Sequence, residues 1–193
     1  MPQTLSKSNN AVIQRYGSGE NFAKTFNPDL QRVCAANVER AFSGDAPSIA
    51  MLLNTYTEKQ VRVWILAQLE NLNTFAGTKN KMEPPQMLML SDVILTEYYY
   101  LKASELLLFF FQFKAGKYGE LYGSVDPLRV SSALIEFDAY RRSELFRIDN
   151  KRKAEQRKIS DVEKEKTAIT IQQYRRLKFK RSKKVWKKKS ASK

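Results

Sequence analysis

The stretch Leu106–Phe113 is the most apolar part of the sequence, so we expect its side chains to be buried in the core. Its letters, LLLFFFQF, contain no glycine, proline or turn-forming residue. Periodicity does not separate a buried strand from a buried helix in so short a run, so both remain open on pattern alone. Ser104 and Glu105 resemble a helix start, and Gly116 with nearby lysines resembles a helix stop. We therefore predict a helix capped by Ser104.

Helical signals also flank this run, whereas no internal repeat and no long alternating strand pattern occurs. Thr57 and Gln60 fit the capping box T-x-x-Q, and Asp126 before Pro127 fits a second helix start. Apolar residues recur at helical spacing in both helices: Val61, Ile65, Leu69 and Leu72 in the first, and Val130, Leu134 and Phe137 in the second. We predict an all-α fold: a compact helical domain with a long C-terminal helix projecting into a basic tail.

Three segments are predicted along the chain. Residues 1–27 lack periodicity and are rich in Asn, Ser, Gln and Gly, which indicates a flexible N-terminal arm. Residues 28–148 carry the helical patterns and form the domain. The apolar face of the long helix ends at Ile148, so residues 149–193 form a basic helical extension and tail.

The composition argues against an enzyme. The chain has no histidine, and its single cysteine is Cys34, so His-based nucleophilic sites and zinc sites of clustered Cys and His are excluded. Glu136 and Asp138, the nearest carboxylate pair, lie two apart on a helix and point in different directions. We expect no catalytic residue, no metal and no cofactor.

A soluble, cytoplasmic protein is expected. The first residues contain no continuous apolar segment of a signal peptide. The best candidate for a membrane span, residues 93–113, is interrupted by Glu97, Lys102 and Glu105. A lone cysteine also fits a reducing compartment.

The net positive charge of the chain is confined to its last quarter. Residues 1–140 contain 13 Lys and Arg against 14 Asp and Glu, whereas residues 141–193 contain 21 against 6. Such asymmetry is typical of an arm that binds a polyanion, either nucleic acid or an anionic membrane surface. A solvated tail that only improves solubility is the alternative.

Aromatic residues interleave with this charge, which favours single-stranded nucleic acid because bases stack on aromatic rings. Ten of the fifteen residues from 175 to 189 are basic. Membrane binding is disfavoured because a wide apolar face is missing. Two weaker alternatives exist for the role of this segment. One is a calmodulin target, because Ile171, Arg176 and Arg181 have the spacing of such a motif, and the other is a nuclear localisation signal. The predicted nucleic-acid-binding residues are Arg175, Arg176, Lys178, Phe179, Lys180, Arg181, Lys183, Lys184, Trp186, Lys187, Lys188 and Lys189.

The glycine stretch after the apolar run is a second candidate site. Gly116, Gly119 and Gly123 fit neither the Walker A pattern nor the dinucleotide pattern, so a nucleotide or other small-molecule ligand is disfavoured. One interpretation is a structural corner whose tyrosines fill the turn. The other is a partner-binding surface formed by Lys117, Tyr118, Glu120 and Tyr122.

The segment SELLLFFFQFKAGKYGELYGSVDPLRVSSALIEFDAYR, Ser104–Arg142, resembles a family of small uncharacterised proteins from gut-bacterial phages and integrative elements. It is loosely similar to helical replication accessory proteins such as phage helicase loaders. That resemblance implies a protein partner, a helicase or another replication protein, which the chain would recruit to DNA. It supplies no catalytic residue.

These observations predict a non-enzymatic, nucleic-acid-binding adaptor without sequence specificity for DNA or RNA. The alternative is a structural or packaging protein of a phage particle or ribonucleoprotein, whose basic arm neutralises nucleic acid.

Overall fold

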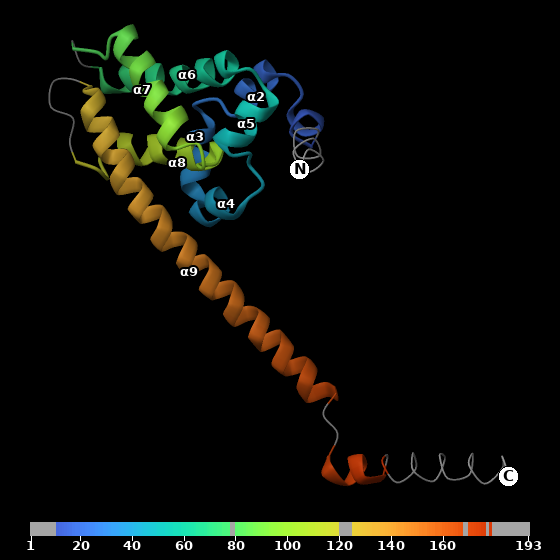
Figure 1. Cartoon of the computed structure of the whole chain (residues 1–193). Helices are drawn as coiled ribbons and strands as arrows, with labels where there is room; N and C mark the ends of the chain where they lie inside the picture. The colour runs from blue at the N-terminus through green and yellow to red at the C-terminus, as the bar shows by residue number, and fades with distance from the viewer. Residues whose placement is uncertain (1–10, 78–79, 120–124, 168–169, 177, 179–193) are drawn as a thin grey trace. The chain divides into compact units, whose positions relative to one another are not determined.

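The computed structural model describes residues 11–77, 80–119, 125–167, 170–176 and 178. Across these residues no strand occurs, and the strand-like features are isolated bridges, one between Ser48 and Lys102 and one at Asn80, so the predicted all-α fold is confirmed. Residues 11–16 and 171–176 are also helical. The labelled helices (Figure 1) are α2 (Gly19–Thr25), α3 (Leu30–Ala36), α4 (Val38–Ser43), α5 (Ile49–Thr55), α6 (Glu58–Ala76), α7 (Pro84–Glu97), α8 (Ala103–Lys114) and α9 (Pro127–Thr167).

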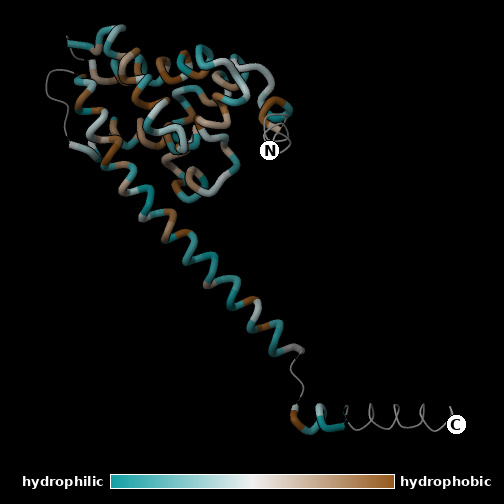
Figure 2. The backbone as a smooth tube through the Cα atoms, viewed as in Figure 1, coloured by the Kyte–Doolittle hydropathy of each residue, from teal (hydrophilic) through white to brown (hydrophobic). Residues whose placement is uncertain are grey.

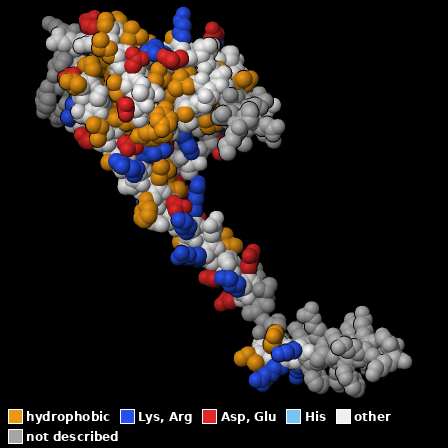
Figure 3. All heavy atoms as spheres, in the orientation of Figure 1, with side chains coloured by type: hydrophobic (Ala, Val, Ile, Leu, Met, Phe, Trp, Pro, Cys, Tyr) orange, Lys and Arg blue, Asp and Glu red, His pale blue; other side chains and the backbone are white. Residues whose placement is uncertain are grey.

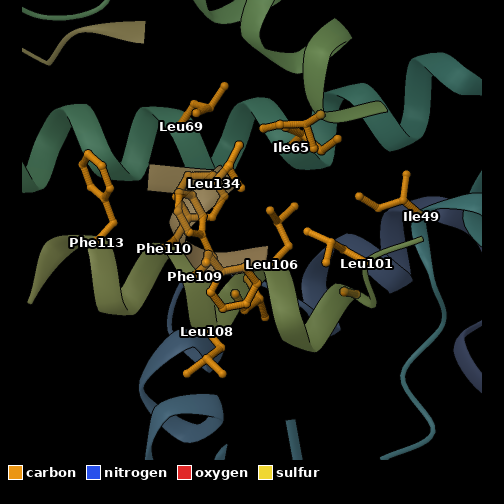
Figure 4. Close-up of a cluster of buried hydrophobic side chains, with 14 of the residues drawn as sticks. Ile49, Ile65, Leu69, Leu101, Leu106, Leu108, Phe109, Phe110, Phe113 and Leu134 are labelled. Atoms are coloured by element: carbon orange, nitrogen blue, oxygen red, sulfur yellow. The ribbon is translucent and has the colours of Figure 1, made fainter. Parts of the chain in front are cut away.

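Helix α8, which contains the apolar run, lies at the centre of the core. It contacts α3, α4 and α6, and Figure 1 shows α6 on one side of it and α4 on the other. In Figure 4, Leu106 and Phe110 point from α8 towards α6, whereas Leu108 points the opposite way. All five side chains from Leu106 to Phe110 are fully buried. A helix that is apolar all round has to be enclosed on every side, and this enclosure accommodates the run.

The start of α8 differs from the prediction. The N-cap residue is Lys102, whose backbone N–H donates to Glu105 Oε2 at 2.9 Å. Ser104 is instead buried inside the first turn, and its hydroxyl donates to Ala41 O at 2.7 Å. The prediction of Ser104 as the cap is wrong because a long-range hydrogen bond uses its hydroxyl.

The first half of α9 covers another side of α8. The predicted residues Val130, Leu134 and Phe137 are all buried. The Phe137 ring packs edge-on against Phe109 with centroids 5.5 Å apart. Leu128 N donates to Asp126 Oδ1 at 2.9 Å, which confirms Asp126 as the start of this helix.

A buried ion pair also joins α8 to α9. Glu105 is fully buried, and its Oε2 accepts a hydrogen bond from Arg141 Nε at 3.0 Å. The Arg141 guanidinium in turn lies over the Tyr100 ring at 5.2 Å. Glu105 Oε1 has no hydrogen-bond partner among the described residues. Burial raises the pKa of Glu105, although Lys102 N–H and Arg141 act in the opposite direction.

The expectation of a flexible arm over residues 1–27 is wrong for residues 11–27. Val12, Phe22 and Phe26 are buried, and the rings of Phe22 and Phe26 stack with centroids 4.8 Å apart. Trp64 Nε1 donates to Phe26 O at 2.8 Å and so ties this segment to α6. The helices here are one or two turns long, too short to show periodicity in the sequence. Residues 1–10 of the predicted arm lie outside the described residues.

The chain divides into two compact units, Met1–Ile148 (unit 1) and Asp149–Lys193 (unit 2), and the division falls within α9. Ile148 is the last buried apolar residue of this helix. Beyond it the described side chains of α9 are exposed, apart from the half-buried Ser160. Figure 2 shows the corresponding change to mostly hydrophilic residues along the second half of α9.

We predict that Glu105→Gln alters the pH dependence of stability. The folded chain holds the Glu105 proton more tightly than the unfolded chain, because burial raises the pKa above 4.5. The contribution of this residue to the free energy of unfolding is therefore largest at low pH and falls as pH rises through the folded-state pKa. Urea unfolding from about pH 4 to about pH 7 should show the wild type losing stability relative to the variant as pH rises. Glu136→Gln, at an exposed position of α9, is the control, and a wild-type-minus-variant difference that stays constant with pH would contradict the prediction.

Candidate nucleic-acid and partner interfaces

The glycine stretch forms a tight turn after α8. Gly116 and Gly119 have positive φ angles of +74° and +91°, a conformation that glycine adopts without steric cost. Their backbone N–H groups donate to Phe113 O at 3.0 Å and to Gly116 O at 3.1 Å, and Lys117 N donates to Gln112 O at 3.0 Å. Because these three donors are used inside the turn, they are not available to cradle a phosphate.

Tyr118 belongs to the core. It is 5% exposed, and its ring lies 5.8 Å from that of Phe109. Its hydroxyl donates to Gln112 Oε1 at 2.5 Å, and burial raises its pKa. The prediction of Tyr118 as a partner contact is therefore wrong, and the structural interpretation of the corner holds for this residue.

Two of the predicted partner residues, Lys117 and Tyr118, are described by the structure, and of these Lys117 is exposed. Its Nζ lies 3.2 Å from the centroid of the Tyr140 ring, in cation–π geometry. Desolvation lowers the pKa of Lys117, and Glu144 partly opposes this shift. The ammonium group thus already has a partner within unit 1. Glu120 and Tyr122 lie outside the described residues.

Arg129 holds the corner against the start of α9. Its Nη2 donates to Tyr118 O, directly beside Gly119. A Cβ atom added at Gly119 would collide with this guanidinium, whereas a Cβ at Gly116 would meet no atom within 4 Å. The two glycines therefore serve different needs: Gly116 allows the turn, and Gly119 also leaves room for Arg129.

We predict that Gly119→Ala destabilises the fold more than Gly116→Ala does. Each variant forces alanine into left-handed backbone, which costs about 1 kcal/mol. Gly119→Ala also breaks the hydrogen bond from the charged Arg129 to Tyr118 O. Its total loss in free energy of unfolding should therefore be about 2–3 kcal/mol. Chemical unfolding of both variants measures the difference. In an Arg129→Ala background, Gly119→Ala should destabilise the fold no more than Gly116→Ala does. If Gly119→Ala remains the more destabilising of the two there, Arg129 is not the cause.

The basic segment, residues 175–189, begins within a short capped helix, residues 171–176. Thr170 Oγ1 accepts from Gln173 N at 3.2 Å, and Gln173 Oε1 accepts from Thr170 N at 2.9 Å, so the two residues form a capping box. Three of the predicted nucleic-acid-binding residues, Arg175, Arg176 and Lys178, are described, and all three are exposed. The others lie outside the described residues: Phe179, Lys180, Arg181, Lys183, Lys184, Trp186, Lys187, Lys188 and Lys189.

Two neighbouring features lie outside the predicted set of nucleic-acid-binding residues, although Tyr174 is among the aromatic residues that the sequence interleaves with the basic ones. Tyr174, 56% exposed, stands one residue before the basic segment and offers a ring for base stacking. Further upstream, the second half of α9 exposes Arg152, Arg157 and Lys158. The run KRKAEQRK signals these charges in the sequence, but acidic residues follow it, and Figure 3 shows both signs along this part of the helix.

Two kinds of site are absent from the part of the chain that the structure describes. No group of three or more Cys, Asp or Glu residues there is arranged to hold a metal ion. Within the same ranges, no helix combines the length and hydrophobicity that crossing a membrane requires.

Comparison with known proteins gives a family without an assigned role. No curated protein matches the chain, and no solved structure matches it. Residues 81–185, just over half of the chain, match the sequence profile of a family of unknown function (DUF6633). The matched range contains α7, α8 and α9 and reaches into the basic segment. The protein thus belongs to the DUF6633 family.

Proposed function

We propose that this protein is a non-enzymatic adaptor that binds DNA or RNA without sequence specificity through its basic segment, while unit 1 holds a protein partner. One observation carries the proposal: the charge changes where the compact units divide. Met1–Ile148 contains 16 Lys and Arg against 15 Asp and Glu, whereas Asp149–Lys193 contains 18 against 5. Unit 1 is thus close to neutral, and the charge suited to phosphates belongs to unit 2.

The chemistry of the exposed residues supports the nucleic-acid part of the proposal. Lys and Arg that neutralise phosphates release bound counterions, which provides affinity without reading sequence. Tyr174 beside Arg175 and Arg176 adds a ring on which an unpaired base can stack. This combination favours single strands over duplexes.

The partner part of the proposal rests on the loose similarity of the helical arrangement to replication accessory proteins such as phage helicase loaders. By that analogy the partner is a helicase or another replication protein, and the protein acts inside the cell, where nucleic acid is replicated. Since Tyr118 is buried and Lys117 contacts Tyr140, the glycine corner gives this part little support.

We predict that the triple variant Arg175→Gln/Arg176→Gln/Lys178→Gln binds single-stranded DNA with a weaker salt dependence. Each lost phosphate contact reduces the slope of log affinity against log salt by about 0.7 on a single strand, so three lost contacts reduce it by about 2. Fluorescence anisotropy of a labelled oligonucleotide, titrated with full-length protein at several salt concentrations, measures the slope.

The matched control removes the same charge from unit 1, at the exposed residues Lys24, Arg32 and Lys59, each changed to Gln. Its slope should equal that of the wild type. Equal loss of slope in both triple variants would show that net charge alone drives binding, and no loss in either would remove the role proposed for Arg175, Arg176 and Lys178.

We further predict that Tyr174→Ala weakens binding to single strands more than to duplexes. A stacked base contributes about 1–3 kcal/mol, which corresponds to a loss of roughly five- to 150-fold in affinity. Tyr174→Phe, which keeps the ring, should bind as the wild type does. An equal effect of Tyr174→Ala on single-stranded and duplex DNA would argue against stacking.

A further inference from the structure

Unit 1 contains a cleft that the proposed function does not use. Its volume is about 350 Å³, at the lower end of the range for sites that bind small ligands. Phe26, Leu30 and Cys34 contribute to an apolar floor, and Arg15, Tyr16 and Arg40 contribute polar groups. We call it the α3–α4 cleft, after the helices that carry Leu30, Cys34 and Arg40.

The two arginines of the α3–α4 cleft have donors to spare. Arg15 lies 3.7 Å from Asp45, which is longer than a hydrogen bond, and both side chains are more than half exposed. Such a pair contributes little and is easily exchanged for another anion. The guanidinium of Arg40 has no hydrogen bond or ion pair with any residue in the described ranges.

Tyr16 adds a neutral donor to the cleft. Its half-buried ring packs edge-on against Phe22 and Phe26, with centroids 5.9 and 5.4 Å away. Burial raises the pKa of its phenol. Arg15 acts to lower this pKa, and Asp45 acts to raise it. The hydroxyl therefore stays protonated at neutral pH and is able to donate a hydrogen bond.

We propose that the α3–α4 cleft binds a carboxylate carried on an apolar body, with the apolar part on the floor and the carboxylate at Arg15 and Arg40. Guanidinium groups suit carboxylates because their planar, forked donors match the two oxygens. The volume accommodates one large side chain or a molecule of similar size. Two sources present this chemistry: the C-terminal residue of a partner protein and a free carboxylic acid.

The inference goes beyond the nucleic-acid proposal and stands independently of it. Of the residues that line the cleft, all but Ser104 precede the range that matches the family. The probes below contain no nucleotide, and the variants leave residues 149–193 unchanged. Failure of one proposal therefore leaves the other intact.

Cys34 provides the readout, because it lies in the cleft and is the only cysteine of the chain. Full-length protein is alkylated with N-ethylmaleimide in the presence of N-acetyl-L-phenylalanine, its amide, phenylbutyrate, or an N-acetylated tetrapeptide Ala-Gly-Ser-Phe with a free C-terminus. Cys34 is buried, so alkylation needs local opening around the cleft, and a ligand that binds the closed form should slow it. We expect the three acids to protect Cys34 and the neutral amide to leave its rate unchanged.

Three variants test whether the ligand that slows alkylation of Cys34 binds in the α3–α4 cleft. Arg15→Gln/Arg40→Gln should raise the half-protecting concentration at least about tenfold, since two charge-assisted hydrogen-bonding groups are lost. The control Lys24→Gln/Arg32→Gln, which removes the same charge from exposed residues outside the cleft, should behave as the wild type. Val33→Trp, which fills the cleft from an exposed position, should abolish protection. Melting temperatures identify any variant that fails to fold.

Each outcome decides the proposal. Stronger protection by the tetrapeptide than by phenylbutyrate assigns the cleft to a protein C-terminus, and the reverse assigns it to a free acid. Equal protection by N-acetyl-L-phenylalanine and its amide would overturn the proposal, as would unchanged protection in the Arg15→Gln/Arg40→Gln variant or no protection by any acid.

Discussion

The enclosure of α8 is the constraint on which the rest of unit 1 depends. Five consecutive large apolar side chains, Leu106–Phe110, are fully buried, and at about 2 kcal/mol each they contribute on the order of 10 kcal/mol. That is as large as the net stability of a typical domain. Their burial needs cover on every side, so α3, α4, α6 and the first half of α9 are committed to the core. The burial of Glu105, on the same helix, follows from this enclosure, and Arg141 compensates for it.

The same constraint explains why the glycine corner is structural. Tyr118 closes the C-terminal end of the α8 core against Phe109, and Arg129 holds its carbonyl. A residue that completes a core has little surface left for a partner. The α3–α4 cleft is different, because its arginines carry donors that no core contact uses. The unused donors of Arg15 and Arg40 therefore make the α3–α4 cleft a better candidate for binding than the glycine corner, although Ser104 of α8 also lines the cleft.

Local sequence signals predicted the local structure well. The capping box of Thr57 and Gln60 is present, Asp126 starts α9, and the apolar run is a helix. The predictions for Ser104 and for residues 11–27, whose structure depends on long-range contacts, were wrong. Ser104 bonds to Ala41, 63 residues away in sequence, and nothing near Ser104 indicates that partner. For the candidate sites, composition located the exposed basic residues, whereas the α3–α4 cleft arises from residues between 15 and 104 that only the fold brings together.

The family match has a physical consequence for the segment that it covers. Residues 81–185 include α8 but not α3, α4 or α6, which all contact it. Cut to this range, the chain would expose the side of α8 that Leu108 faces and the side that Phe110 faces (Figure 4). The matched segment is thus not a self-sufficient fold, and a relative that shares only this range needs other apolar surface to cover its α8. The range keeps together a helix that depends on its surroundings and a basic segment whose described residues, Arg175, Arg176 and Lys178, are exposed.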